Sequence, residues 1–480
     1  MKKLIALLLV VMFAMPLLAS CGGSGGGGTI RVWVGEESAE YYQTLCDEYL
    51  AEHSDFGYKI EVKGMNTGSV AGTITTDPQA AADIYTVAHD NIGKLASKNA
   101  YAKPFTDQSL IDQVLADNPE SFKKVIYSLN ESDNNMYIYG VPYISQALFL
   151  YYNKALVTEE QAKSFEGLRE AAQAAGTKAV TVTGDDGYNM SFALLATKVS
   201  DHSTTVKIYE GADPFLGGSK GTSNCQGDDT VAIVRWLQDF KEDPNGFKWA
   251  SQDGWRADFD NKNNGVLAVI GGAWHYNTAK DAVGETNLGI ALIPTFTLTE
   301  KSVEGLTGVK AGDVYRGGTF ADCKCFMINA YSDPGKYAKE QELVKYLSSK
   351  EAQNKSYLNC QNVPAYSGAS EFIKQCLDEG KISENQYELA SKQVEMAGWG
   401  IPQPFLNGTL NTYYYSKNAP SVFKAMIDKT AYPTTGNIIL TETESLESIR
   451  KGLYLMEYLW MHGSNPSEIP VGGGTLPKAA

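Results

Sequence analysis

Residues 265–274 read Gly-Val-Leu-Ala-Val-Ile-Gly-Gly-Ala-Trp, and residues 288–294 read Leu-Gly-Ile-Ala-Leu-Ile-Pro. The continuous apolar run from Val266 to Ile270 predicts a strand buried on both faces, as in the mainly parallel sheets of α/β proteins. The glycines that follow predict a tight turn at the end of this strand. Because ligands of open α/β sheets bind beyond the carboxyl ends of the strands, this turn makes Trp274 a candidate ligand contact.

The rest of the chain also predicts an α/β fold, because strand and helix signals alternate. Residues 30–34, 58–62 and 83–87 read as strands. Three segments place apolar side chains at helical spacing: Tyr42, Leu45, Cys46, Tyr49 and Leu50; Ile233, Trp236, Leu237 and Phe240; and Leu446, Ile449, Leu453, Met456 and Trp460. We therefore expect mainly parallel sheets that are covered by helices on both faces.

The first 28 residues predict export and membrane anchoring. A basic start and an apolar run shorter than the ~20 residues of a membrane span are typical of a signal peptide, here residues 1–20. Cys21 follows Leu-Ala-Ser, and this stretch resembles the lipobox of bacterial lipoproteins, in which the cysteine is acylated. Residues 21–28 then form the lipidated cysteine and a glycine-rich tether. A signal peptide with a chance cysteine is the alternative.

The composition disfavours several kinds of partner. The chain has 480 residues and a net charge of −15, so it repels phosphate backbones, and nucleic acid is not an expected partner. The five histidines are dispersed, without the spacing of metal ligands, so no metal site is predicted. No cofactor is predicted either, and the protein is expected to be a monomer. The sequence does not decide whether the six cysteines besides Cys21 form disulfides: Cys46, Cys225, Cys323, Cys325, Cys360 and Cys376.

Four segments follow one another in an order that is typical of one protein family. They are residues 82–90 (ADIYTVAHD), 140–143 (GVPY) leading to 150–154 (LYYNK), 265–274 and 288–294. In this order they resemble the extracellular solute-binding proteins of carbohydrate ABC transporters (family 1), especially the maltose/maltodextrin-binding group. The resemblance implies a two-lobed, type II periplasmic-binding-protein-like α/β fold with a multi-strand hinge and a ligand cleft between the lobes. The implied lobes are residues 29–144 plus 292–364 and residues 145–291 plus 365–480.

The resemblance also implies polar ligand contacts. Asp90 aligns with an acceptor of sugar hydroxyls in maltodextrin binders, and a helix N-cap is the other reading of this aspartate. Glu36 and Glu37 follow the first strand, where the family places an acidic residue, although both also fit a solvated surface. Gln146 stands in place of an acid, and its amide can both donate and accept. Asn189 fits a further contact loop of the family.

Aromatic side chains complete the expected sugar site, because a sugar presents C–H faces as well as hydroxyls. Trp274 matches the stacking tryptophan of the family, with a core position as the alternative, and His275 and Tyr276 follow it. The opposite wall is expected around Trp399 and three tyrosines that could also form the buried stripe of the next helix: Tyr413, Tyr414 and Tyr415.

The sequence thus predicts a non-catalytic receptor, lipid-anchored on the outer face of the bacterial cell membrane. We expect it to bind a malto-oligosaccharide or another α-glucoside and to deliver it to the permease subunits of an ABC importer. A surface glycoside hydrolase is an alternative, and it would need two carboxyl groups about 5–9 Å apart across the sugar. The same fold with a polyol or iron as cargo is a further alternative.

Overall fold

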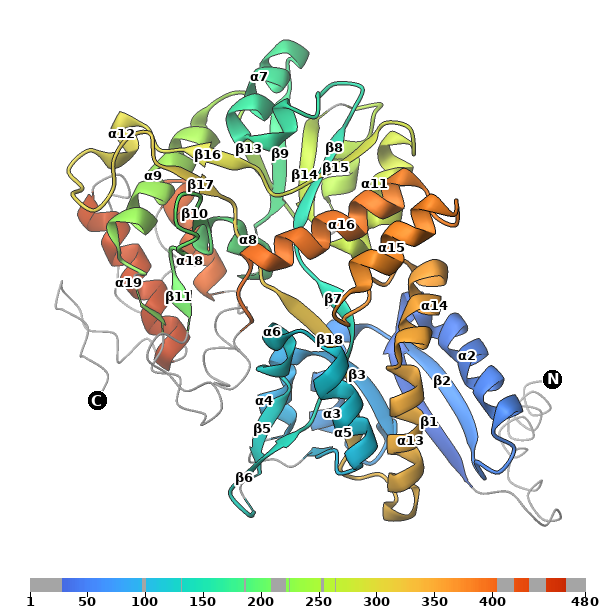
Figure 1. The fold of residues 1–480 in the computed structure, drawn as a ribbon. Helices are drawn as coiled ribbons and strands as arrows, with labels where there is room; N and C mark the ends of the chain where they lie inside the picture. The colour runs from blue at the N-terminus through green and yellow to red at the C-terminus, as the bar shows by residue number, and fades with distance from the viewer. Residues whose placement is uncertain are drawn as a thin grey trace, which may run out of the picture.

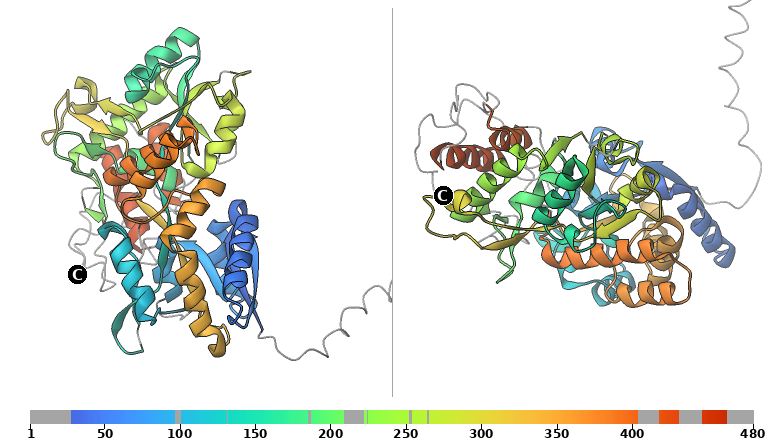
Figure 2. Two further views of the ribbon diagram at one scale, coloured as in Figure 1. Left: turned by 45° about the vertical axis from the view of Figure 1, so that its right-hand side comes forward. Right: turned by 90° about the horizontal axis from the view of Figure 1, so that it is seen from above.

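The computed structural model describes residues 28–96, 101–130, 132–184, 187–208, 222–223, 225–251, 254–263, 265–403, 418–430 and 446–462. The predicted signal peptide, Cys21 and the candidate contacts Tyr413, Tyr414 and Tyr415 lie outside these residues. The described residues form two lobes, each built around its own central sheet, as Figure 1 and the further views of Figure 2 show.

The first lobe contains a mixed sheet with the strand order β2-β1-β3-β18-β4, and β7 also pairs with β18. The strands are β1 (Thr29–Gly35), β2 (Lys59–Met65), β3 (Ile84–Ala88), β4 (Ala102–Lys103), β7 (Val141–Gln146) and β18 (Asp322–Asn329). β1 is parallel to β2 and β3, whereas β18 runs antiparallel to β3 and β7. The helices of this lobe are α2 (Ala39–Glu52), α3 (Thr67–Thr76), α4 (Ile92–Ala96), α5 (Gln108–Asp117), α6 (Glu120–Lys123) and α13 (Tyr337–Leu347), and a hairpin joins β5 (Tyr127–Asn130) to β6 (Asn135–Ile138).

The second lobe contains a sheet with the strand order β13-β9-β14-β8-β15. The strands are β8 (Phe149–Asn153), β9 (Lys178–Thr183), β13 (Phe247–Ala250), β14 (Val266–Gly271) and β15 (Leu288–Ala291). A smaller sheet contains β10 (Thr197–Lys198), β16 (Thr295–Thr297) and β17 (Val314–Arg316). The helices are α7 (Phe165–Ala175), α8 (Gly187–Leu194), α9 (Asp228–Glu242), α10 (Trp255–Phe259), α11 (Tyr276–Val283), α12 (Glu300–Val303), α15 (Ala369–Asp378), α16 (Glu384–Trp399), α18 (Asn418–Ile427) and α19 (Leu446–His462).

The predicted α/β class is confirmed, and apolar residues of the predicted helices and strands are buried. Helix α2 buries Tyr42, Leu45, Cys46 and Tyr49, and β14 is buried along its whole length. In each sheet one strand, β18 in the first lobe and β8 in the second, runs against all the others, so both sheets are mixed. Each reversed strand directly follows a connection between the lobes: β8 comes after Ala147 and Leu148, and β18 comes after residues 317–321.

In the described part of the chain three crossings join the lobes, so the predicted multi-strand hinge is confirmed. The first crossing is the pair Ala147 and Leu148 between β7 and β8, and the second is residues 317–321 between β17 and β18. Leu148 N–H donates to Thr319 Oγ1 at 2.7 Å, which links these two crossings. The third crossing follows α14 (Lys350–Cys360), and Ser145 N–H donates to its Val363 carbonyl at 2.8 Å.

The second crossing lies later in the chain than the expected lobe boundary at residue 292. Ile293, Phe296 and Phe320 pack into the hydrophobic core of the second lobe, whereas Cys323 and the residues after it in β18 pack into the core of the first. The reason is that β16 and β17 pair with each other and, through β10, remain attached to the second lobe before the chain returns.

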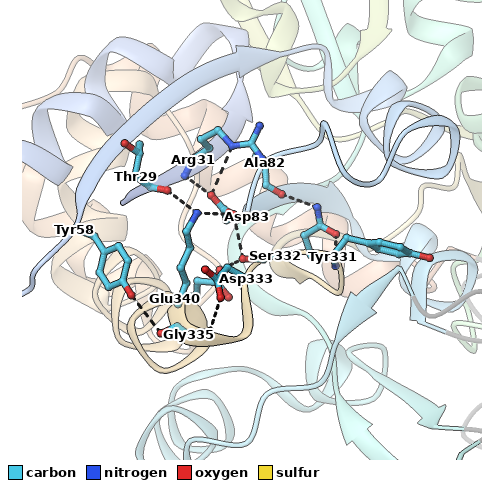
Figure 3. A network of polar contacts seen from close by, with 12 residues as sticks. Thr29, Arg31, Tyr58, Ala82, Asp83, Tyr331, Ser332, Asp333, Gly335 and Glu340 are labelled. Carbon is cyan, nitrogen blue, oxygen red and sulfur yellow. Dashed lines mark hydrogen bonds and ion pairs between the residues drawn. The ribbon is translucent and has the colours of Figure 1, made fainter. Parts of the chain in front are cut away.

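A polar network fixes the start of β1 at the far edge of the first-lobe sheet (Figure 3). Asp83 accepts a hydrogen bond from the Arg31 backbone N–H at 2.7 Å and another from Ser332 Oγ at 3.0 Å. Lys336 Nζ lies 3.1 Å from Asp83 Oδ1 and donates to the Thr29 carbonyl at 2.6 Å. The network therefore ties the first described strand to β3 and to the turn that follows β18.

Candidate functional site

The carboxyl edge of the first lobe, where its parallel strands end, collects residues that are far apart in the sequence. β18 begins at this edge because Lys324 pairs with Ala88, the last residue of β3. β7 ends there because Gln146 pairs with Asp322, the first residue of β18. The topology thus brings the predicted residues to one edge: Glu36, Glu37, Asp90 and Gln146.

Two other predicted residues, Asn189 and Trp274, lie at the carboxyl edge of the second lobe. Asn189 lies in α8, after β9, and Trp274 lies in the short helix η4 (Ala273–His275), after β14. β8 begins at this edge, because Phe149 pairs with Gly271 at the end of β14. Only two residues separate the end of β7 from the start of β8, so the carboxyl edges of the two lobes face each other at the hinge.

Glu36 and Glu37 form an exposed turn directly after β1. The Glu37 carboxylate folds back over Gly35, where a Cβ atom would lie 2.6 Å from its Oε1. Glu37 Oε1 lies 3.4 Å from Nζ of Lys324, a buried residue of β18. The position of the Glu37 carboxylate is therefore set by both β1 and β18.

Asp90 lies in the turn η2 (His89–Asn91) after β3 and is 9% exposed. Its Oδ1 accepts a hydrogen bond from Asn91 Nδ2 at 2.9 Å. Asn91, and not Asp90, directly precedes helix α4, which argues against the N-cap reading. Gln146 is buried to the same degree at the end of β7.

A buried ion pair lies beside these residues. His89 Nδ1 is 2.5 Å from Asp322 Oδ1, and both side chains are almost completely buried. Burial by itself lowers the pKa of His89, but the negative charge of Asp322 and the hydrogen bond to it raise this pKa well above the ordinary value. The contact with Asp322 thus favours the protonated imidazole, and it holds Asp322 where the second crossing enters β18.

Trp274 is the exposed aromatic group of the second edge, with 41% of its surface accessible. Its ring lies over Gly272, where a Cβ atom would come within 2.2 Å of the ring carbons. The ring centroid of Tyr188 is 5.8 Å away. This exposure excludes a core position for Trp274. Tyr276, by contrast, is buried, and its hydroxyl donates to Glu285 Oε1 at 3.0 Å.

Trp399 lies at the end of α16, and other protein groups cover its ring. His202 stacks on it with a centroid distance of 4.2 Å and an interplanar angle of 18°, and the Arg316 guanidinium carbon is 5.1 Å from its centroid. His202 has a φ of 58°, which few residues other than glycine adopt. The ring of Trp399 therefore has less free surface for a sugar than that of Trp274.

Sequence reasoning gave no role to His89, Asp322 or Lys324. His89 is part of one of the four family segments, and Asp322 and Lys324 are the two charged residues of the fully buried strand Asp-Cys-Lys-Cys-Phe-Met-Ile-Asn. The two charges within an expected buried strand could have drawn attention to Asp322 and Lys324, because lysine and aspartate are seldom fully buried without a partner.

The described ranges contain neither a metal-binding cluster nor a membrane-spanning helix. No cluster of three or more histidine, cysteine, aspartate or glutamate side chains is arranged there to hold a metal ion. None of the helices in the described part of the chain has the length and apolar character that a membrane span requires.

The chain is similar in sequence to two solute-binding proteins of known ligand class. The chain is 25% identical over 313 residues to a maltooligosaccharide ABC transporter solute-binding lipoprotein of Streptococcus pneumoniae, covering 61% of this chain and 68% of the relative. It is 24% identical over 434 residues to the maltodextrin-binding protein MdxE of Bacillus subtilis, covering 84% and 88% of the two chains.

Solved structures show the same fold. The ligand-free maltodextrin-binding protein MalE1 of L. casei superposes with a TM-score of 0.67 at 17% identity, covering 90% of this chain and 99% of that one. MalX of Streptococcus pneumoniae in complex with maltopentaose gives a TM-score of 0.61 at 17% identity, covering 89% and 99%. The fold is therefore the two-lobed periplasmic-binding fold.

The sequence profile of one family matches residues 44–379, which is well over half of the chain. Together with the two lobes and their facing carboxyl edges, this match shows that the chain belongs to the bacterial extracellular solute-binding proteins.

Proposed function

We propose that this protein is a non-catalytic receptor that captures a malto-oligosaccharide between its two carboxyl edges and delivers it to the permease of an ABC importer. The observation that carries the proposal is the exposed indole of Trp274 on one edge, opposite the carboxylates, amide and ammonium of the other. Sugars are recognised by this combination of an aromatic surface and paired hydrogen-bonding groups. The names of the relatives, which specify maltooligosaccharide and maltodextrin, support the choice of ligand.

The proposal includes a lipid anchor on the outer face of the bacterial cell membrane. Cys21, within a lipobox-like stretch, is the acylated residue, and the tether that follows lets the lobes stand clear of the bilayer. A relative described as a lipoprotein supports this arrangement. The protein then acts as a monomer beside its permease.

Calorimetric titration with maltose, maltotriose and maltotetraose tests the proposed function. We expect saturable binding at one site per chain. A reducing-sugar assay on the same mixtures should show no turnover. Release of reducing ends would contradict the receptor and support a glycoside hydrolase, and the absence of binding to all three sugars would contradict the choice of ligand.

A further inference from the structure

Lys324 is a buried lysine whose ammonium group has few protein partners. The residue is 6% exposed and lies in β18, the strand that enters the first lobe from the hinge. Among the residues that the structure describes, its polar partner is Glu37: Lys324 Nζ donates to Glu37 Oε1 at 3.4 Å. Lysines are rarely buried without a close partner, so this position calls for an explanation.

Two other lysines are paired with aspartates that are almost completely buried. Lys336 Nζ donates to the Thr29 carbonyl at 2.6 Å and lies 3.1 Å from Asp83. Lys198 Nζ lies 2.9 Å from Asp313 Oδ2. The contact of Lys324 is longer than any of these distances, and an ammonium group has three N–H donors. Most of the donor capacity of Lys324 is therefore unused by the described residues.

The pair lies where a ligand of the first lobe would be held. β3 separates β1 from β18 in the sheet, so the contact between Glu37 and Lys324 reaches across the end of β3. Lys324 pairs with Ala88, two residues before Asp90. The Glu37 side chain is 51% exposed and that of Lys324 is 8% exposed, so solvent reaches the pair through Glu37.

The Glu37 carboxylate faces the ammonium group of Lys324. This carboxylate folds over Gly35, the position where a Cβ atom would clash. A second glycine, Gly64, makes room for the same turn, because a Cβ there would lie 3.0 Å from Glu36 Cα. The turn after β1 is thus built so that a carboxylate faces Lys324.

From these observations we infer that Lys324 contacts the ligand and donates hydrogen bonds to hydroxyl groups of the bound saccharide, while Glu37 orients it. The inference rests on the proposed function and adds to it a residue that determines specificity. A charged donor next to hydroxyl acceptors forms the stronger kind of hydrogen bond, and a saccharide that lacks the matching hydroxyl leaves the buried ammonium unsatisfied.

Calorimetric titration of the variant Lys324→Met with maltotriose and its monodeoxy analogues tests this role. We expect the affinity for maltotriose to fall about tenfold, the loss of one charged hydrogen bond. For the analogue that lacks the contacted hydroxyl, the variant should lose no affinity relative to the wild type, because no hydrogen bond to Lys324 is left to remove. Lys198→Met, which removes a paired lysine from the other lobe, is the control and should bind as the wild type does.

Each other outcome has a distinct meaning. Equal maltotriose affinity in Lys324→Met and the wild type would overturn the role of Lys324 and leave the proposed function intact. An equal loss against every analogue would show a structural effect and overturn direct contact. Failure of the wild type to bind any of these sugars would overturn the proposed function and this inference with it. If Lys324→Met does not fold, Lys324→Gln removes the charge while keeping a polar side chain, and the same outcomes apply.

Discussion

Trp274 owes its exposed position to the glycine turn beneath it. The indole ring lies over Gly272 and is 41% exposed, so it contributes little to the hydrophobic core. We predict that Trp274→Ala weakens malto-oligosaccharide binding by about 2 kcal/mol, roughly thirtyfold, because stacking aromatics often dominate such sites. Calorimetry measures the affinity, and thermal unfolding should show a midpoint close to that of the wild type.

Tyr331→Ala is the matched control for this prediction. Tyr331 is 49% exposed and follows β18 at the far edge of the first-lobe sheet, away from the carboxyl edge. Its removal should leave the affinity unchanged. Unchanged affinity in Trp274→Ala would exclude Trp274 from the ligand site.

The two kinds of candidate residue differ in how far the sequence could reveal them. Trp274 could be predicted because a buried strand and its glycine turn are local patterns. The pairs His89–Asp322 and Glu37–Lys324 could not, because their partners are 233 and 287 residues apart. Only the fold, which places β18 beside β3, brings these charges together.

At the scale of elements, helix α13 contributes a buried carboxyl group to the network at the far edge of the first lobe. Ser332 Oγ lies between Asp83 Oδ1 and Glu340 Oε1 and carries a single proton (Figure 3). A protonated Glu340 can donate to Ser332, which then donates to Asp83. Burial raises the pKa of Glu340 to about 7, and the charge of Asp83 adds to this, although Ser332, Lys103 and Lys336 oppose it.

This pKa predicts how stability depends on pH. The folded protein keeps the Glu340 proton up to about pH 7, whereas the unfolded chain loses it near the ordinary value of 4.5. The free energy of unfolding should therefore fall as the pH rises through this window, by on the order of 3 kcal/mol from this group. Chemical denaturation measures the free energy of unfolding at about pH 5 and at about pH 8. The difference between these two values should be smaller for Glu340→Gln than for the wild type.

Glu351→Gln, which changes an exposed glutamate of the next helix, is the control and should keep the wild-type pH dependence. A Glu340→Gln variant with the same pH dependence as the wild type would show that Glu340 does not carry the proton.

Elements with a strong local pattern were predicted well, and their partners were not. The strands around residues 30–34 and 266–270 and the apolar stripe of α2 follow from periodicity alone. The antiparallel direction of β18 and the late return of the chain to the first lobe depend on pairing between distant strands. Periodicity carries no information on such pairing, which is why the expected boundary at residue 292 came too early.

At the scale of the whole molecule, the lipid anchor makes a separate prediction. Cys21→Ser removes the thiol that is acylated, so the protein should leave the membrane fraction and appear in the medium or periplasm. Cell fractionation with an antibody measures this. Cys46→Ser, which changes a buried cysteine of α2, is the control and should stay with the membrane. Membrane retention of Cys21→Ser would contradict anchoring through this residue.

The three crossings at the hinge predict a movement of the lobes on ligand binding. A sugar that contacts both carboxyl edges binds the closed form better than the open form and shifts the population toward it. Small-angle X-ray scattering with and without saturating maltotetraose therefore tests the central claim, capture of a malto-oligosaccharide between the lobes, most directly. We predict a smaller radius of gyration in the presence of the sugar, and an unchanged scattering curve at saturation, confirmed by calorimetry, would contradict it.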